Sequence, residues 1–254
     1  MSERQRMSGW QLLAILVITT GLGFVSAISG GGTGALVTPG LILIGLSPSH
    51  AVAAGRFAGL GVGTGSLWRF VKKNIVDWKW VRILMPISMF LSAAASLIVV
   101  DMPKNILENG VALATISVAL VLLIDRKAGM KQRNTSRHNK QIGSLIFWTI
   151  DFTRFVFASG FSTLNMYVMM RLLGMDALTA NATKRAIAFP SLFISISIFI
   201  FNGTVEWPVA LTLLLGFFLG SQAGAKIAIA KGSKMVRNTL TVVAIVIGFT
   251  ILFT

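Results

Sequence analysis

The sequence has no cysteine and only two histidines, His50 and His138, among its 254 residues. The absence of cysteine excludes disulfides, thiolate metal sites and cysteine nucleophiles. Acidic residues are also scarce, with 8 against 23 lysines and arginines. Two histidines and few carboxylates provide no usual metal-ligand spacing and no cluster of acid–base groups. We therefore predict that the protein is not an enzyme and has no catalytic residues, no metal site and no cofactor.

Charged residues of either sign make up only 12% of the chain, whereas hydrophobic residues reach 54% and the mean hydropathy is +0.78. A soluble domain has about 25% charged residues, so water alone is excluded as the solvent. Apolar runs of roughly 20 residues recur along the whole length, with no interval of soluble-domain size between them. We predict an all-α polytopic membrane protein, a single domain over residues 1–254 that is solvated by the lipid bilayer.

The net charge of +15 comes largely from three short basic stretches between apolar runs. They hold 15 of the 23 lysines and arginines, with five in Arg69–Arg82, six in Arg126–Lys140 and four in Lys226–Arg237. Such clusters follow the positive-inside rule for cytoplasmic loops that face anionic lipid. Membrane topology therefore explains the charge, and no nucleic-acid partner is expected.

The chain is internally duplicated. A shift of 129 residues aligns its halves without a gap from about Gly31 onward. The matched pairs include Gly31 and Gly160, Gly45 and Gly174, Arg56 and Arg185, and Trp78 and Trp207. We predict repeat 1 over about residues 10–125, a basic cytoplasmic loop over 126–141, and repeat 2 over about 142–254. The first apolar run aligns with a mid-chain run over 142–157, so we expect a retained helix rather than a signal peptide.

Each half contains about five apolar segments, of which the second is short. In each half a long apolar helix is followed by a glycine-rich or serine-rich break, the short segment and three more helices. The expected segments of repeat 1 are Trp10–Ile28, Ala35–Leu46, Ala51–Phe70, Trp80–Val100 and Ile106–Ile124. Those of repeat 2 are Ile142–Phe157, Leu164–Met175, Ala180–Phe201, Trp207–Ala230 and Asn238–Phe253. Trp78 and Trp207 are expected to anchor helix starts at the membrane interface.

The two repeats carry their basic loops at different places. The loop after Ala51–Phe70 has five basic residues, whereas its counterpart, Asn202–Glu206, has none. The next loop reverses this bias, with one basic residue in Asp101–Asn105 and four in Lys226–Arg237. Opposite bias at matched positions predicts inverted-topology repeats. The N-terminus lies outside if the short segments cross the membrane; if they are re-entrant, the parity changes and the argument for inversion weakens.

The short segment of repeat 1 follows a run of small residues that breaks the preceding helix. Ala35–Leu46 has 12 residues and, at about 1.5 Å per residue, cannot span the bilayer alone. Non-helical backbone at membrane depth must be buried in protein or line a watery cavity. Small residues there either let an anion approach the backbone and the next helix N-terminus, or pack helices closely. The candidate substrate-binding residues of the two breaks are Gly30, Gly31, Gly32, Thr33, Ser159, Gly160, Ser162 and Thr163.

Arg56 and Arg185 are matched by the duplication and lie about one turn inside the helix after each break. A charge there costs roughly 2.5 to 3.5 kcal/mol on insertion scales, so each arginine should face the interior and have a partner. No carboxylate in the same half is spaced to pair with either one. We predict that both bind a small anionic substrate through the guanidinium fork. The alternative is that they reach a nearby headgroup layer, which Lys184 beside Arg185 favours.

Asp151 and Arg154 are three residues apart on an expected helix, which places them on one face as a pair. The pair is either structural or couples transport to protons through Asp151. Asn165 and Asn181 are neutral polar residues inside apolar segments, and we expect them to form interhelical hydrogen bonds rather than to bind substrate.

Several of these features occur together in one known family. Ser29-Gly30-Gly31-Gly32, Pro39, Gly45 and the turn Asn74-Ile75-Val76-Asp77-Trp78 resemble the sulfite exporter TauE/SafE family over nearly the whole chain. Repeat 2 departs from the family's usual second glycine-rich stretch with Ser159-Gly160-Phe161, so the two half-sites need not be equivalent.

The resemblance implies a transporter of the bacterial cytoplasmic (inner) membrane that exports sulfite, an organosulfonate or a related sulfur oxyanion. The residues themselves indicate an anion but not sulfur. Two inverted halves that hold the anion between their broken segments would work by alternating access. The alternatives are an anion channel and a non-transporting membrane assembly partner, and the sequence indicates no oligomeric state.

Overall fold

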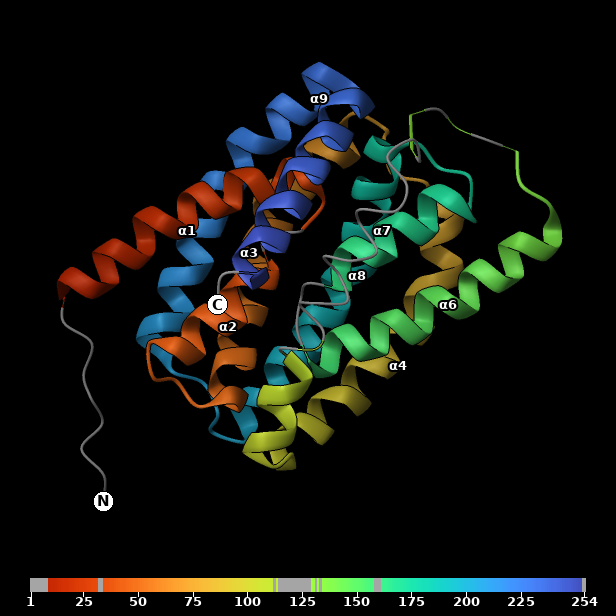
Figure 1. Ribbon diagram of the computed structural model, residues 1–254. Helices are drawn as coiled ribbons and strands as arrows, with labels where there is room; N and C mark the ends of the chain where they lie inside the picture. Colours follow the sequence, from red (N-terminus) through yellow and green to blue (C-terminus); the bar gives the residue numbers. More distant parts are fainter. Residues whose placement is uncertain are drawn as a thin grey trace.

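The protein is helical throughout the part that its structure describes. The computed structural model describes residues 9–31, 34–111, 113, 129–130, 132, 134–157 and 161–252, and these contain no strand. The helices are α1 (Gly9–Ser29), α2 (Gly34–Leu43), α3 (Pro48–Lys72), α4 (Trp78–Asp101), α6 (Arg137–Val156), α7 (Ser162–Arg171), α8 (Ala177–Phe201) and α9 (Trp207–Leu252) (Figure 1). The all-α fold predicted from composition is confirmed.

Within the described residues, four helices are long and apolar enough to cross a membrane: α1, α4, α8 and the part of α9 over Trp207–Val243. Large apolar side chains on these helices face outward, among them Phe90 and Phe201, which are 72% and 89% exposed. Lipid solvates such a surface, whereas water does not. The chain is therefore a multi-pass membrane protein, as predicted.

α2 and α7 are the short helices that follow the two breaks. Each has 10 residues and a length of about 15 Å, half of the roughly 30 Å hydrocarbon core. α1 ends at Ser29 just before α2, and α6 ends at Val156 just before α7. Helix, break and short helix thus occur in the same order in both halves.

The helix bounds follow the sequence duplication. Adding 129 to the bounds of α3 gives residues 177–201, which are the bounds of α8. The same shift carries the first residue of α4 to the first residue of α9. Trp78 and Trp207 occupy these two helix starts and are both about half exposed. α3 and α8 therefore begin and end at equivalent residues, and α4 and α9 begin at equivalent residues.

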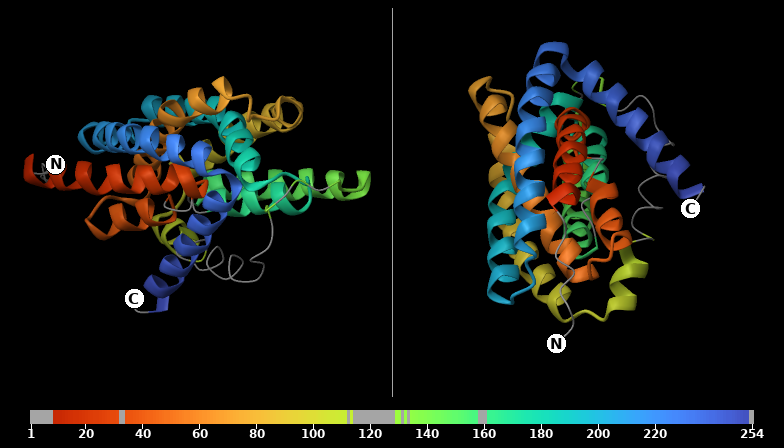
Figure 2. Two further views of the ribbon diagram at one scale, coloured as in Figure 1. Left: turned by 90° about the horizontal axis from the view of Figure 1, so that it is seen from above. Right: turned by 90° about the vertical axis from the view of Figure 1, so that its left-hand side faces the viewer.

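α4 and α9, the matched helices that begin at Trp78 and Trp207, each pack against the other half. α4 lies against α6 and α8, whereas α9 lies against α1 and α3. α3 and α8, which carry the matched arginines, also contact each other. α1 and α6 extend to opposite sides of the molecule (Figure 2, left). This exchange of helices joins the halves into one body.

α6 begins at Arg137 rather than at residue 142, where the apolar run begins. The Ser136 side chain caps the helix by accepting a hydrogen bond from the Asn139 N–H at 3.2 Å. The cap lets a polar first turn precede the apolar run, so hydropathy alone misses it. Of the segment expected over 106–124, only residues 106–111 and 113 are described, and residues 104–111 are helical.

The basic stretch Lys226–Arg237 contains two helical ends that meet at Gly232, where the sequence predicted a loop. Gly232 has a φ of +68°, which glycine adopts without strain. The chain therefore turns sharply within α9 without additional loop residues (Figure 2, right). Ser233 Oγ, next to the turn, donates to Asp176 Oδ1 at 2.5 Å and ties the turn to the start of α8.

Asp176 caps α8 at this junction. Besides the Ser233 bond, its carboxylate accepts from Thr179 Oγ1 at 2.7 Å and from the Leu178 and Thr179 N–H groups at 3.0 and 3.1 Å. Burial opposes ionisation of Asp176, but these hydrogen bonds outweigh it and hold the pKa below its ordinary value. The carboxylate is therefore charged at neutral pH, and its stabilising effect is lost only as the pH falls through this lowered pKa.

Candidate functional site

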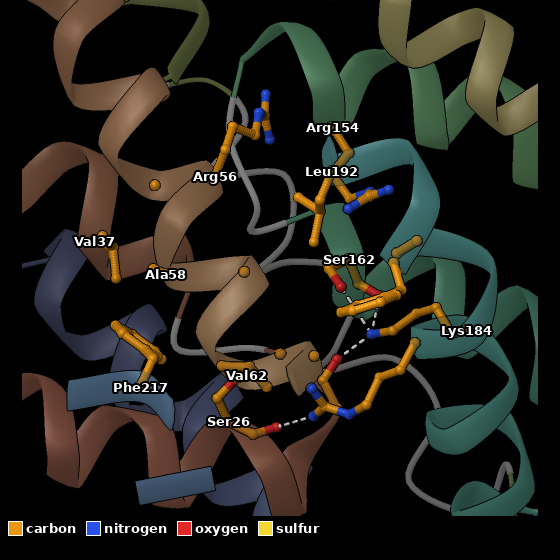
Figure 3. Close-up of a pocket in the computed structure, with 18 residues that line it drawn as sticks. Ser26, Val37, Arg56, Ala58, Val62, Arg154, Ser162, Lys184, Leu192 and Phe217 are labelled. Carbon is orange, nitrogen blue, oxygen red and sulfur yellow. Dashed lines mark hydrogen bonds between the residues drawn. The ribbon is translucent and has the colours of Figure 1, made fainter. Parts of the chain in front are cut away.

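The two helix breaks face a common cavity. It has a volume of about 80 Å³, which is room for several water-sized groups. Its polar lining residues are Ser26, Arg56, Arg154, Ser162, Lys184 and Arg185, and Gly30 and Gly31 also line it. Val37, Val62 and Phe217 lie on the side opposite Arg154 and Lys184 (Figure 3). Gly30 and Gly31 belong to repeat 1 and Ser162 to repeat 2, so the cavity lies between the halves.

Four cationic side chains of the cavity wall are buried. Arg56, Arg154, Lys184 and Arg185 are 3%, 7%, 6% and 7% exposed. Asp151 is the one buried carboxylate in the part of the chain that the structure describes. Four cations and one carboxylate leave three positive charges in excess, in a site where an unpaired charge is costly. This excess favours an anion as the occupant of the cavity.

Arg56 and Arg185 make equivalent hydrogen bonds across the two halves. Arg56 Nη2 donates to the Phe155 carbonyl at 2.5 Å, and Arg185 Nη2 donates to the Ser26 carbonyl at 2.7 Å. Ser26 and Phe155 are themselves 129 residues apart, and each lies in the last turn before a break. The C-terminal end of a helix carries partial negative charge that attracts cations. Each arginine therefore caps the broken helix of the other half.

The two arginines differ in the donors that they leave open. Arg185 Nε donates to Asn181 Oδ1 at 2.9 Å, and Asn181 Nδ2 donates to the Ala27 carbonyl at 2.9 Å. Arg56 Nε is buried, and no acceptor among the described residues reaches it. The Arg56 guanidinium also packs against the Phe155 ring, 5.0 Å from its centroid. Burial of both arginines does not support the alternative in which they reach lipid headgroups.

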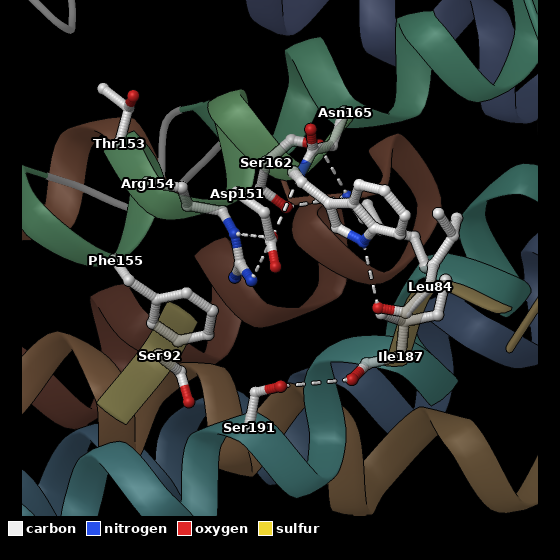
Figure 4. A network of polar contacts seen from close by, with 12 residues as sticks. Leu84, Ser92, Asp151, Thr153, Arg154, Phe155, Ser162, Asn165, Ile187 and Ser191 are labelled. Atoms are coloured by element: carbon white, nitrogen blue, oxygen red, sulfur yellow. Dashed lines mark hydrogen bonds and ion pairs between the residues drawn. The ribbon is translucent and has the colours of Figure 1, made fainter. Parts of the chain in front are cut away.

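Asp151, Arg154 and Asn165 form a buried network beside the cavity (Figure 4). Arg154 Nη2 and Nε donate to Asp151 Oδ1 at 2.6 and 2.9 Å, and Asn165 Nδ2 donates to the same oxygen at 3.0 Å. The same-face pair expected from the spacing is therefore present, and Asn165 joins α7 to α6. Asp151 Oδ2 is buried without a donor among the residues described.

Lys184 joins the two breaks. Its Nζ donates to the Gly30 carbonyl of repeat 1, and to the carbonyl and Oγ of Ser162 in repeat 2 at 3.0 and 2.8 Å. Gly31 has a φ of +105°, and a Cβ on it would lie 3.0 Å from Ser162 Oγ. Both its backbone conformation and this close approach favour glycine. The small residues of the break thus pack closely against repeat 2 and line the cavity at once.

The sulfite exporter TauE/SafE family model matches residues 14–251. The chain belongs to the TauE/SafE family. The probable membrane transporter protein YfcA of Escherichia coli (strain K12) is 24% identical over 243 residues, covering 95% of this chain and 90% of YfcA. The probable membrane transporter protein ORF9 of Sinorhizobium sp is 27% identical over 252 residues, covering 96% and 93% of the two chains. No solved structure matches this TauE/SafE protein.

The TauE/SafE cavity gathers much of the site predicted from the sequence. The predicted substrate-binding residues that line it are Gly30, Gly31, Arg56, Ser162 and Arg185, and Arg154 of the predicted coupling pair lines it as well. Thr163 is buried, and its hydroxyl has no partner among the described residues, but it is not part of the lining. The other predicted residues, Gly32, Thr33, Ser159 and Gly160, lie outside the described residues.

Sequence reasoning missed one cation of the TauE/SafE cavity. In the sequence, Lys184 favours a headgroup position for the neighbouring Arg185, yet the lysine itself is buried in the cavity wall. The available signal was a second cation directly beside Arg185 within an apolar helix that contains no acid. Two adjacent cations in such a helix require interior partners, because membrane burial of each charge is costly.

Proposed function

We propose that this protein is a secondary transporter, rather than an enzyme, that exports sulfite or a related organosulfonate or sulfur oxyanion across the bacterial cytoplasmic membrane. The observation that carries the proposal is the cavity between two broken helices, lined by four buried cations with one buried carboxylate nearby. Membership of a family described as sulfite exporters supports the choice of a sulfur oxyanion.

The two halves support a mechanism of alternating access. We infer that they are inserted in opposite orientations, because their basic loops occur at opposite places in the two repeats. The substrate lies where both helix breaks meet, and movement of one half against the other exposes the cavity to each side in turn. The cross-half bonds of Arg56 and Arg185 are the contacts that such a movement changes.

Purified protein reconstituted in liposomes is expected to release sulfite at a saturable rate that increases when sulfite is added outside. Saturation and exchange arise because a carrier binds one substrate per cycle, whereas a channel gives flux that rises linearly with concentration. The measurement compares protein-containing with empty vesicles, and repeats it with sulfoacetate, thiosulfate and sulfate. Equal release from both kinds of vesicle for all four anions would refute the transport of sulfur oxyanions and favour an assembly partner.

Asp151 is proposed to couple efflux to protons. Protonation of its open oxygen would release Arg154 to the anion, so an acidic interior should accelerate wild-type efflux. Replacing Asp151 with asparagine is expected to make the rate independent of internal pH. Sulfate is the appropriate substrate for this measurement, because its own charge does not change when the internal pH is lowered.

The coupling experiment holds the membrane potential constant with a potassium ionophore. Asp101→Asn, the same substitution at an exposed carboxylate, should keep the wild-type pH dependence. If wild-type efflux itself ignores internal pH, Asp151 has a structural role as the partner of Arg154.

A further inference from the structure

Lys184 is a cavity cation that only one of the two halves supplies at its matched position. The duplication matches Arg185 with Arg56, but it matches Lys184 with Gly55. Gly55 also lines the cavity, so equivalent positions contribute a charge from one half and none from the other. Close packing does not require this lysine, because the matched glycine occupies an equivalent place in α3. Lys184 therefore gives the cavity a charge that the arrangement of the helices does not require.

The hydrogen bonds of Lys184 set the direction of the Ser162 hydroxyl. An ammonium group only donates, so Ser162 Oγ is the acceptor in their 2.8 Å contact. The hydroxyl proton of Ser162 is then free for a second partner, and no acceptor for it is found among the described residues. Since Ser162 lines the cavity, this proton is available to an anion oxygen. Lys184 thus acts on the occupant twice, through its own charge and through the serine that it orients.

The charge balance indicates what kind of anion fits. With three positive charges in excess, a monoanion leaves two of them unbalanced and a dianion leaves one. At a fixed distance, the Coulomb energy between Lys184 and a dianion is twice that with a monoanion.

Resting on the proposed function, we propose that Lys184 is a specificity-determining residue that makes this cavity prefer doubly charged oxyanions over singly charged ones of the same shape. The preference follows because each negative charge on the anion is attracted separately by the ammonium group of Lys184. Removing Lys184 should therefore weaken dianion binding by about the square of the factor for a monoanion.

The test compares thiosulfate with methanesulfonate, which share an SO₃ group and differ by one charge. In Lys184→Met, we expect the concentration for half-maximal efflux to rise about fivefold for methanesulfonate and about 25-fold for thiosulfate. Ser162→Ala, which removes one neutral donor, should raise both values by similar factors. Lys231→Met, the same substitution at an exposed lysine of α9, should change neither.

Equal factors for the two anions in Lys184→Met would overturn the proposal, because a merely structural lysine affects both alike. If this variant does not elute as a folded protein, Lys184→Arg provides the test: it keeps the charge, so the thiosulfate preference should persist, and its loss would contradict the proposal. The same ratio can be measured in detergent, from the stabilisation that each anion gives against thermal unfolding. A wild type that moves no anion but is stabilised preferentially by thiosulfate would refute transport while supporting the specificity of the cavity.

Discussion

Replacing Arg56 with glutamine is expected to lower sulfur-oxyanion efflux at low substrate concentration on the order of 100-fold. Arg56 lines the cavity, and its buried Nε has no acceptor among the described residues. The other three cations are held by carbonyl groups or by Asp151, so they cannot all turn toward the anion to replace it. The measurement is the initial rate of sulfite release from liposomes containing equal amounts of folded protein.

Three further variants define the role of Arg56. Arg56→Lys keeps the charge but loses the planar fork, and should retain part of the activity. Arg185→Gln should have a smaller effect, because its Nε and Nη2 already bind Asn181 and the Ser26 carbonyl. Arg137→Gln, the same substitution at an exposed arginine, should behave as wild type. Normal efflux in folded Arg56→Gln would mean that this arginine only caps α6.

The order of helices and breaks was predictable because its signals are local. Apolar runs and small-residue interruptions are visible along the chain. Because the halves align at a shift of 129 residues, each run and each interruption can be compared with its counterpart in the other half. The start of α6 was missed because capping by Ser136, rather than hydropathy, determines it. The turn at Gly232 was expected as a loop because a single residue with positive φ leaves little trace in composition. The local sequence pattern thus predicted which helices form better than it predicted the residues at which they begin and end.

The site was only partly predictable, because it depends on which helix packs against which half. The two matched arginines could be predicted as site residues, because no carboxylate in the same half is spaced to pair with either one. Their partners, the carbonyls of Ser26 and Phe155, are backbone groups with no signature in the sequence. To predict the place of Lys184, the packing of the halves must also be known, because its hydrogen-bond acceptors lie in both breaks. The exchange of α4 and α9 between the halves, which creates these contacts, leaves no local pattern.

That exchange makes close packing of α9 on α1 a condition for the cavity. Replacing Gly220 of α9 with valine is expected to destabilise the fold by more than about 3 kcal/mol, above the usual range for overpacking. A Cβ at Gly220 would lie 2.7 Å from the Phe24 backbone nitrogen of α1. Backbone atoms cannot rotate away as a side chain can, so the two helices must separate. Gly23, next to Phe24 in α1, approaches the backbone of Phe217, about one turn from Gly220 in α9, in the same way.

Gly21→Val is the matched control, because Gly21 also lies inside a helix but has no atom within 4 Å of its would-be Cβ. The comparison, made by denaturant unfolding in mixed micelles, cancels the change in helix propensity between glycine and valine. Separation of the helices would also move Ser26 and Phe217, which line the cavity from α1 and α9, so Gly220→Val should lose anion binding together with stability. Equal stability of the two variants would contradict the close crossing of α1 and α9, and with it the way in which the exchanged helices form the anion site.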